Sequence, residues 1–186
     1  MEAGRKLATG GDPEGAIAFF GAARELDANL DLDAETEAQR IVVPYLARNL
    51  VEKGNMLVKK GEVKEAIATL AKAQKLDPML EISAYSWNNL CWFGSLHGYA
   101  ADVMYACENT VALDPENVGI RDSRGLARAL SGDIEGAIAD FQAFLDFWAD
   151  NNEKRLQRQR WIEALRAGDR PFTPEEIETL LNQFYV

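Results

Sequence analysis

The sequence is poor in the residues that build metal sites, thiol chemistry and disulfide frameworks. Its 186 residues include two cysteines and one histidine. Zinc sites usually take four Cys and His ligands, so no metal site is expected. Two cysteines are also too few for a disulfide framework, and we expect Cys91 and Cys107 to be buried small side chains. No phosphate loop, dinucleotide fingerprint or metal motif occurs, so the sequence predicts no catalysis and no cofactor.

Positive charge and long apolar runs are scarce as well. The formal net charge is −10, from 20 Lys and Arg against 30 Asp and Glu. Nucleic acid is not an expected partner, because its phosphates attract clustered basic residues, and an anionic membrane surface is disfavoured for the same reason. No apolar run reaches the roughly 18 residues that span a bilayer. Residues 1–10 lack the apolar core of a signal peptide, so we expect a cytoplasmic protein.

What the chain does contain is an internal repeat with helical periodicity. Four similar segments each follow a glycine that we expect in a turn: Gly11, Gly61, Gly98 and Gly132. Five residues after each glycine stands Ala or Val, and nine residues after it stands Phe20, Leu70, Cys107 or Phe141. Small side chains let two helices approach closely, while the larger ones fill the layer between neighbouring pairs. The spacing from Gly98 to Gly132 is 34 residues, the period of the tetratricopeptide repeat.

On these residues the chain resembles the tetratricopeptide repeat (TPR) family, including the closing prolines Pro78 and Pro115 of the middle repeats. The resemblance implies an all-α fold, a right-handed TPR helical-repeat solenoid with C-terminal capping helices. It implies four helix pairs over residues 1–150, with repeat 1 truncated at its start and an insertion near 31–46. Residues 151–186 fall outside the repeat, and we expect them to form the capping helices.

Two stretches suggest a narrower resemblance: WNNLCWFGSLHGYAADVMYACENTVALDPEN and IRDSRGLARALSGDIEGAIADFQAF. They are similar to TPR arms of large bacterial multidomain proteins, which accompany STAND-type NTPase, WD40 or caspase-like protease domains. This likeness implies a C-terminal piece of a longer polypeptide.

In the TPR family the first helix of each pair lines a concave groove that holds the ligand. Carried over slot by slot, the resemblance implies eight partner-binding residues: Arg48, Asn55, Tyr85, Asn88, Asn89, Trp92, Asp122 and Leu126. The three asparagines are the most suggestive, because an amide offers both a donor and an acceptor to a peptide backbone. Tyr85 and Trp92 would add aromatic anchors. The alternative is that these are ordinary solvated residues of a repeat.

The chaperone-binding type of TPR clamps a C-terminal carboxylate with three cations and two asparagines. The corresponding slots of this chain hold Val51, Asn55, Asn89, Gly119 and Ser123. Because all three cations are missing, no clamp of that kind is expected.

The resemblance implies a non-catalytic scaffold that binds a protein or peptide segment in its groove. The alternative function is a sensor or regulatory arm of a larger bacterial NTPase or protease, whose partners would be other domains of the same chain. Self-association of the module is a third possibility, which would depend on protein concentration.

The tail carries the expected caps. A helix over 151–167 would present the apolar stripe Leu156, Trp161, Ile162 and Leu165, and Gly168 would end it. We expect this stripe to cover the end of repeat 4 at Phe144, Phe147 and Trp148. The sequence from Thr173 to Glu176 fits a capping box and predicts a last helix over about 174–184.

The tail is also basic within an acidic chain, through Lys154, Arg155, Arg158, Arg160, Arg166 and Arg170. Such a run is usually a solvated helix face, and we expect that here. The alternative is a docking surface for the acidic remainder of the chain, a second copy or a partner.

Three further expectations concern single positions. Pro44 falls inside a long helix that opens at Asp33 or Ala34, where it predicts a kink or a break. His97 precedes Gly98 and is expected to be a turn residue. Cys91 and Cys107 lie on opposite helices of one repeat, so a redox pair is the alternative to two inert thiols, although neither has a base or cation beside it in sequence.

Overall fold

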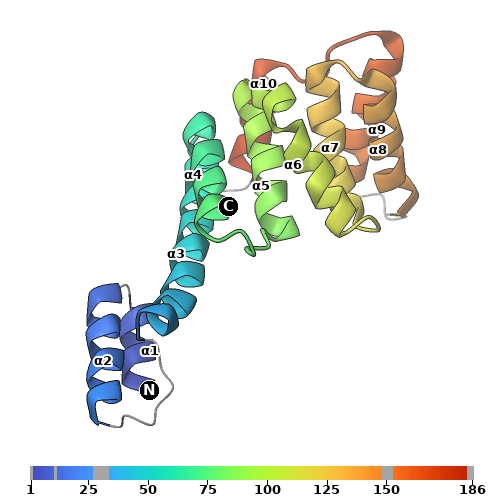
Figure 1. Cartoon of the computed structure of the whole chain (residues 1–186). Coiled ribbons are helices and arrows are strands. Elements are labelled where there is room, and N and C mark those ends of the chain that lie inside the picture. The colour runs from blue at the N-terminus through green and yellow to red at the C-terminus, as the bar shows by residue number, and fades with distance from the viewer. Residues whose placement is uncertain (1, 11, 27–33, 148–152, 184–186) are drawn as a thin grey trace. The chain divides into compact units, whose positions relative to one another are not determined.

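The computed structural model describes residues 2–10, 12–26, 34–147 and 153–183, and within these ranges it is helical with no strand (Figure 1). This confirms the all-α class. The helices are α1 (Glu2–Thr9), α2 (Pro13–Leu26), α3 (Ala34–Lys59), α4 (Val63–Leu76), α5 (Ala84–Gly94), α6 (Ala100–Leu113), α7 (Val118–Ser131), α8 (Ile134–Phe147), α9 (Glu153–Ala167) and α10 (Pro174–Asn182).

The chain divides into two compact units. Unit 1 comprises Met1–Gly54 and Ala68–Glu81, and unit 2 comprises Asn55–Ile67 and Ile82–Val186. Helices α3 and α4 therefore contribute residues to both units. Most of the predicted binding residues belong to unit 2.

Unit 1 holds a small apolar core beneath α1 and α2. Ala16, Phe20 and Val42 are buried, and partly buried apolar side chains pack against them. Gly4 is needed for the close approach of α1, because a Cβ atom there would lie only 2.8 Å from Phe20 Cε1. Helix α3 runs unbroken through Pro44, so the predicted break is not found. A proline removes a single backbone donor, and the hydrogen bonds on either side of it keep the helix continuous.

The turn glycines of the repeat are where the sequence places them. Gly61, Gly98 and Gly132 have φ values of 84°, 86° and 97°, which favour glycine because it has no Cβ atom. Gly11 lies outside the described residues. The segment Ser95–Tyr99 has helical residues on both sides of Gly98, whose positive φ interrupts the helix. It is therefore the turn between α5 and α6, as the position of His97 predicted.

Small residues hold the helix pairs of unit 2 together. A Cβ atom on Gly94 of α5 would lie 2.7 Å from Val103 Cγ1 of α6, and one on Gly125 of α7 would lie 2.9 Å from Phe141 Cε1 of α8. Ala137, in the slot five residues after a turn glycine, is fully buried. The repeat thus places small side chains where two helices touch.

A buried carboxylate fixes α7 against α8. Asp140 is 1% exposed and accepts hydrogen bonds from Arg124 and Arg128, each at 2.8 Å. Glu108 of α6 accepts from the same two arginines. The hydrogen bond with Asp140 raises the pKa of Arg124, so its charge persists. This cluster sets the orientation of α7, which carries part of the candidate site.

Cys91 of α5 and Cys107 of α6 form a disulfide bond, and both side chains are fully buried. Their burial was predicted correctly, but they are bonded to each other rather than being two free thiols. The helix pair explains the bond, because it brings the Cα atoms of Cys91 and Cys107 to within 4.9 Å of each other. The bond lies against Ala127 of α7.

Helix α9 packs against α8 and covers the end of repeat 4. Trp161, Ile162 and Leu165 are buried, and the Trp161 ring lies 5.4 Å from that of Phe141. Leu156 is 40% exposed, however, and Phe147 is 63% exposed, so neither takes the buried place that the sequence predicted for it. Trp148 lies outside the described residues. Phe144 is buried, as the sequence predicted. The cover extends to Phe141, nearly two helical turns before Phe147, because its ring packs on Trp161 of α9.

Candidate functional site: a groove in unit 2

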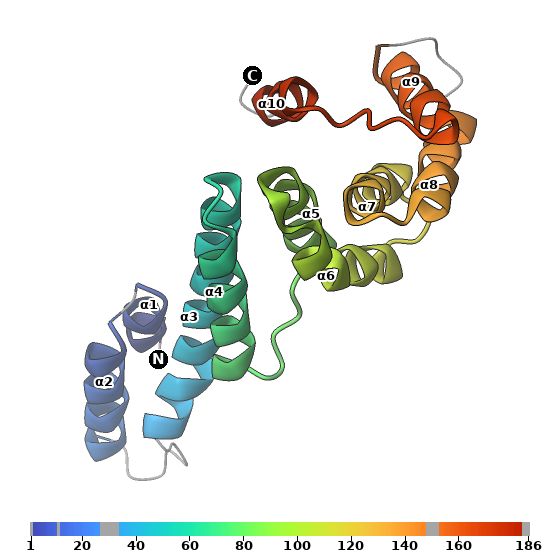
Figure 2. The ribbon, with the colours of Figure 1, turned by 90° about the horizontal axis from the view of Figure 1, so that it is seen from above.

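A groove of about 900 Å³ lies in unit 2, lined mainly by α5, α7, α9 and α10. Figure 2 shows how these helices are arranged: an extended segment leads from α9 to α10, and α10 lies on the side of α5 that faces away from α6. The floor is formed by the first helices of two successive repeats, α5 and α7. The walls come from the two C-terminal helices.

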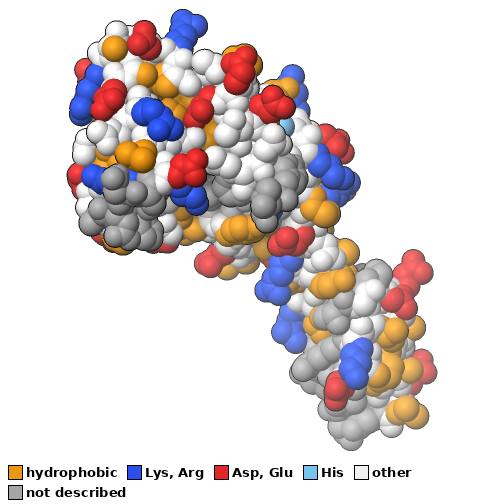
Figure 3. All heavy atoms as spheres, turned by 180° about the vertical axis from the view of Figure 1, so that it is seen from behind, with side chains coloured by type: hydrophobic (Ala, Val, Ile, Leu, Met, Phe, Trp, Pro, Cys, Tyr) orange, Lys and Arg blue, Asp and Glu red, His pale blue; other side chains and the backbone are white. Residues whose placement is uncertain are grey.

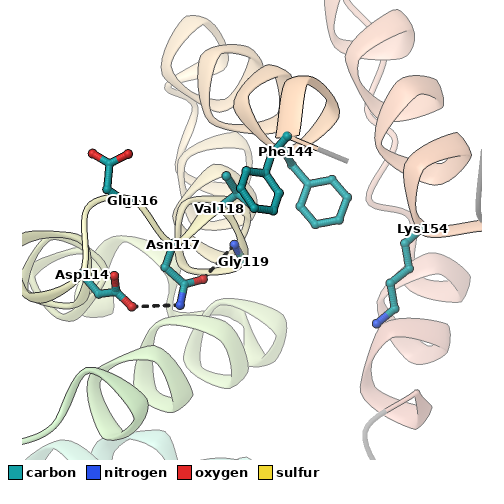
Figure 4. Close-up of a pocket in the computed structure, with 8 residues that line it drawn as sticks. Asp114, Glu116, Asn117, Val118, Gly119, Phe144 and Lys154 are labelled. Atoms are coloured by element: carbon teal, nitrogen blue, oxygen red, sulfur yellow. Dashed lines mark hydrogen bonds between the residues drawn. The ribbon is translucent and has the colours of Figure 1, made fainter. Parts of the chain in front are cut away.

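An apolar pocket of about 560 Å³ continues the groove at one end (Figure 4). Val118, Phe144 and Phe147 supply its apolar lining, and Lys154 reaches toward it from α9. Five residues line both cavities, so the two form one continuous surface: Asp114, Asn117, Gly119, Phe144 and Lys154.

The rim of this pocket is held by the cap of α7. Asn117 Oδ1 accepts hydrogen bonds from the backbone N–H groups of Gly119 and Ile120, at 3.1 and 3.4 Å. Asn117 Nδ2 donates to Asp114 Oδ2 at 2.9 Å. The start of α7 is therefore a fixed edge of the site rather than a loose loop.

A buried ion pair forms the wall between α7 and α9. Arg158 Nε donates to Asp122 Oδ1 at 2.9 Å, and its Nη2 donates to Asp122 Oδ2 at 2.6 Å. Arg158 is 6% exposed and Asp122 is 4% exposed. The guanidinium also lies 4.6 Å from the Trp161 ring centre and 5.2 Å from that of Phe144. The prediction of a solvated Arg158 is thus wrong, because its flat guanidinium is matched by a carboxylate and by two aromatic faces.

The ion pair continues into a hydrogen-bonded chain that reaches α10. Arg158 Nη1 donates to Gln157 Oε1 at 2.6 Å, and Gln157 Nε2 donates to Glu176 Oε1 at 2.7 Å. The same oxygen of Glu176 accepts from Trp161 Nε1 at 2.9 Å. Asp122, Arg158, Gln157 and Glu176 therefore link α7, α9 and α10 in sequence.

The cap of α10 is confirmed in part. Thr173 Oγ1 accepts from the backbone N–H of Glu176 at 3.3 Å, as a capping residue does. In a full capping box the Glu176 carboxylate would turn back to the N–H of Thr173. Here it accepts from Gln157 and Trp161 instead, so a residue expected to serve the helix end joins the groove wall.

The predicted asparagines are largely buried. Asn55 and Asn89 are 5% and 6% exposed, and Asn55 Nδ2 donates to Ser86 Oγ at 3.1 Å. Asn88 is half-buried and lines the groove. Among the described residues, Asn55 Oδ1, Asn88 Oδ1 and Asn89 Nδ2 are buried without a hydrogen-bond partner. Buried polar atoms are nearly always bonded, so these open positions favour a polar ligand or water beside α5.

The structure brings four of the eight predicted residues together on the groove: Tyr85, Asn88, Trp92 and Asp122. Tyr85 is 61% exposed, and its hydroxyl accepts from Lys59 Nζ at 3.3 Å. Leu126 is fully buried and belongs to the core, so no ligand reaches it. Arg48 is exposed and belongs to unit 1.

The residues missed from the sequence are those of the two C-terminal helices. Gln157, Arg158, Arg160 and Glu176 all line the groove. The repeat could not indicate them, because α9 and α10 lie outside its register. A signal was present in the basic composition of α9 within an acidic chain, and docking onto the same chain was the alternative interpretation of that composition. Arg158 agrees with that alternative interpretation, because it binds Asp122 of the same chain.

Neither a metal-binding cluster nor a membrane-spanning helix is found among the residues that the structure describes. No group of three or more His, Cys, Asp and Glu side chains there could hold a metal ion. Over the same residues, no helix combines the length and the apolar character needed to cross a bilayer. On the face shown in Figure 3, acidic and basic side chains are interspersed rather than gathered by sign.

Comparison with known proteins identifies the fold. No family model matches the chain, and no curated protein matches it. Among solved structures it is similar to the TPR domain of P58(IPK), with a TM-score of 0.56 and 18% sequence identity. The match covers 90% of this chain and 46% of that one, so this chain spans about half the length of the solved domain. The chain therefore has a TPR-like helical-repeat fold.

Proposed function

We propose that the chain is a non-catalytic recognition module that binds a segment of another protein in the groove of unit 2. The observation that carries this proposal is the continuous surface of groove and apolar pocket, built on the first helices of two successive repeats. A TPR-like fold is typical of protein-interaction modules, which supports the same conclusion.

The lining favours a short segment with an apolar anchor. Val118, Phe144 and Phe147 offer an apolar pocket for one large side chain. Asn88 lines the groove, and its buried amide oxygen has no hydrogen-bond partner among the described residues, so a donor on a bound segment would satisfy it. Exposed charges of both signs surround the opening, with Lys154 and Arg160 near Glu153. Such a surface suits a peptide that carries mixed charge rather than a polyanion.

Site-specific photocrosslinking tests the proposal with a matched pair of tyrosines. Tyr85 lines the groove from α5 and is 61% exposed, whereas Tyr105 of α6 is 44% exposed and packs on Trp87. Each is replaced in turn by benzoylphenylalanine, and crosslinked segments are identified by mass spectrometry. We expect benzoylphenylalanine at position 85 to crosslink to one reproducible segment, and we expect the Asn88→Ala variant to lower the yield of that crosslink. We expect no crosslink to the same segment from position 105. Equal capture at both positions would refute a groove site.

The alternative function, a sensor or regulatory arm of a larger bacterial NTPase or protease, is supported by the likeness of the two stretches around α5–α8. It uses the same groove but fills it with a domain of the same polypeptide. Crosslinks from position 85 to another domain within the same polypeptide molecule would establish it. Self-association would instead give crosslinks between two copies and a mass that rises with concentration.

The compartment is a separate proposal. We propose the cytoplasm, and the observation that counts against it is the Cys91–Cys107 disulfide bond, because such bonds are commoner in oxidising compartments. Acid quenching of intact cells, followed by alkylation of the denatured protein and mass spectrometry of its peptides, separates the two, because both cysteines are buried in the folded chain. Alkylated Cys91 and Cys107 are expected in the cytoplasm, and an unmodified, bonded pair would contradict that location.

A further inference from the structure

Helix α10 forms one side of the groove and is attached to the rest of the chain only at its N-terminal end within the described residues. Glu176 and Thr179 line the groove from α10, together with Gln183 just beyond it. Leu180 is fully buried, and α10 contacts the turn Ser95–Tyr99 at the end of α5. The helix therefore spans from α9, where Glu176 is bound, back to repeat 3. A segment of the chain itself thus bridges α9 and the turn that follows α5.

We propose that α10 is an exchangeable wall of the groove, whose place a partner helix takes. The partner would present a carboxylate in its first turn and an apolar side chain four residues later, in place of Glu176 and Leu180. This proposal rests on the proposed function, because it names the class of ligand that the same groove takes.

The partner helix needs a carboxylate because release of α10 leaves two hydrogen-bond donors of α9 without their acceptor. Gln157 Nε2 and Trp161 Nε1 both donate to one oxygen of Glu176, at 2.7 and 2.9 Å. Gln157 is 7% exposed and Trp161 is 3% exposed. Without an acceptor, two buried donors would lose their hydrogen bonds, which is costly. A carboxylate satisfies both donors from one atom, and Arg158 nearby favours its negative charge.

The apolar requirement follows from Leu180. Positions four apart lie on the same side of a helix, so Leu180 lies one turn beyond Glu176 and is buried where α10 packs on the rest of unit 2, while Glu176 and Thr179 line the groove. Leu180 is the fully buried residue among those described in α10, while Ile177 and Leu181 are half-buried. A competing helix therefore needs one well-placed apolar side chain, with room for a second on either side.

The attachment of α10 suits an exchangeable segment. The helix has nine residues, and a helix of that length is marginal by itself in water. Its N-terminal connection contains Gly168, with a φ of 83°, followed by residues without helical structure. Phe172 anchors this connection on Trp161, at a ring distance of 4.9 Å. Release beyond Phe172 would thus leave α9 and its aromatic contacts in place.

The test uses the full chain and its own C-terminal segment as the probe. A fluorescein-labelled peptide of residues 171–186 is titrated against the wild-type chain and against Leu180→Asp, which expels α10 by burying a charge. Glu178→Lys is the matched control, because Glu178 is exposed on the same helix. We expect the peptide to bind Leu180→Asp about tenfold more tightly than wild type or the control, since affinity scales with the open fraction. A peptide with Glu176→Ala should bind about tenfold more weakly.

Equal affinity of the peptide for the wild-type and Leu180→Asp chains would overturn the proposal, provided that circular dichroism shows both to be folded. Should Leu180→Asp fail to fold, Glu176→Ala in the full chain replaces it, with amide hydrogen exchange as the readout. We expect faster exchange over 176–182 and unchanged exchange in α9, and uniform exchange in both helices would refute a separable α10. A partner segment that crosslinks outside the groove, while the peptide still binds, would refute the proposed function alone.

Discussion

Arg158 of α9 and Asp122 of α7 form a buried bidentate ion pair, although they lie 36 residues apart in the sequence. The pair fixes the first capping helix on repeat 4 and forms a wall of the groove. Because both side chains are nearly inaccessible, each charge depends on the other for its stabilisation. Removing either one leaves an uncompensated charge inside the protein.

We therefore expect Arg158→Gln to lower the free energy of unfolding by about 3–5 kcal/mol, the usual cost of breaking a buried pair. Arg166→Gln is the control on the same helix, where an exposed arginine should contribute less than about 0.5 kcal/mol. Chemical denaturation of both variants measures the difference. Two equally small effects would show that Arg158 is solvated after all.

A double variant tests whether Asp122 is the partner of Arg158. Asp122→Asn combined with Arg158→Gln should cost less than the sum of the two single changes, because the second removes a charge that the first has already stranded. Strict additivity of the three unfolding free energies would mean that the two side chains do not interact.

The sequence predicts the local parts of this fold well and its long-range parts poorly. Gly61 and Gly132 could be placed in turns because their positions recur with the repeat. Thr173 could be recognised as a cap because its partners follow within three residues. Arg158 could not be placed, since its burial depends on Asp122 in another helix. Glu176 fits a capping box locally, but the donors of α9 attract its carboxylate more strongly than the helix end does.

The close contact between α7 and α8 gives a prediction at Gly125. A Cβ atom there would meet Phe141 at 2.9 Å, so Gly125→Ala should overpack the pair and cost about 1–3 kcal/mol. At Gly21 of α2 nothing lies within 4 Å of the added atom, and Gly21→Ala should stabilise its helix by about 0.5–1 kcal/mol. Thermal unfolding followed by circular dichroism compares the two. Stabilisation by both substitutions would contradict the packing of α7 on α8.

The disulfide bond predicts a stability difference that reduction reveals. The two cysteines are 16 residues apart, and a loop of about that size contributes about 3 kcal/mol by restricting the unfolded chain. The double variant Cys91→Ala and Cys107→Ala should unfold at lower denaturant than the oxidised protein. Wild type in reducing agent should approach the double variant. If reducing agent leaves the wild-type midpoint unchanged, the thiols are not bonded in solution.

The start of α10 predicts a titration with a definite sign. The carboxylate of Glu175 accepts from its own backbone N–H and from the Thr173 hydroxyl, and these hydrogen bonds lower its pKa below the ordinary 4.5. Because the folded pKa is the lower one, the stabilising contribution is complete above about pH 4.5 and is lost as the pH falls through the folded pKa. A carboxyl ¹³C titration of wild type and Thr173→Val measures the shift. The midpoint of Glu175 should rise in the variant, and identical midpoints would show that Thr173 does not donate to it.

The central claim is that the groove of unit 2 binds the partner, and one affinity comparison tests it most directly. A peptide of the segment crosslinked at position 85 is titrated against wild type, Asn88→Ala in the groove and Asp102→Ala on α6, with unfolding midpoints measured for all three. We predict that Asn88→Ala weakens binding about tenfold, or about 1.4 kcal/mol, with little change in its midpoint, while Asp102→Ala binds like wild type. Unchanged affinity in Asn88→Ala together with a loss in Asp102→Ala would contradict the account and place the binding surface on the other face of the repeat.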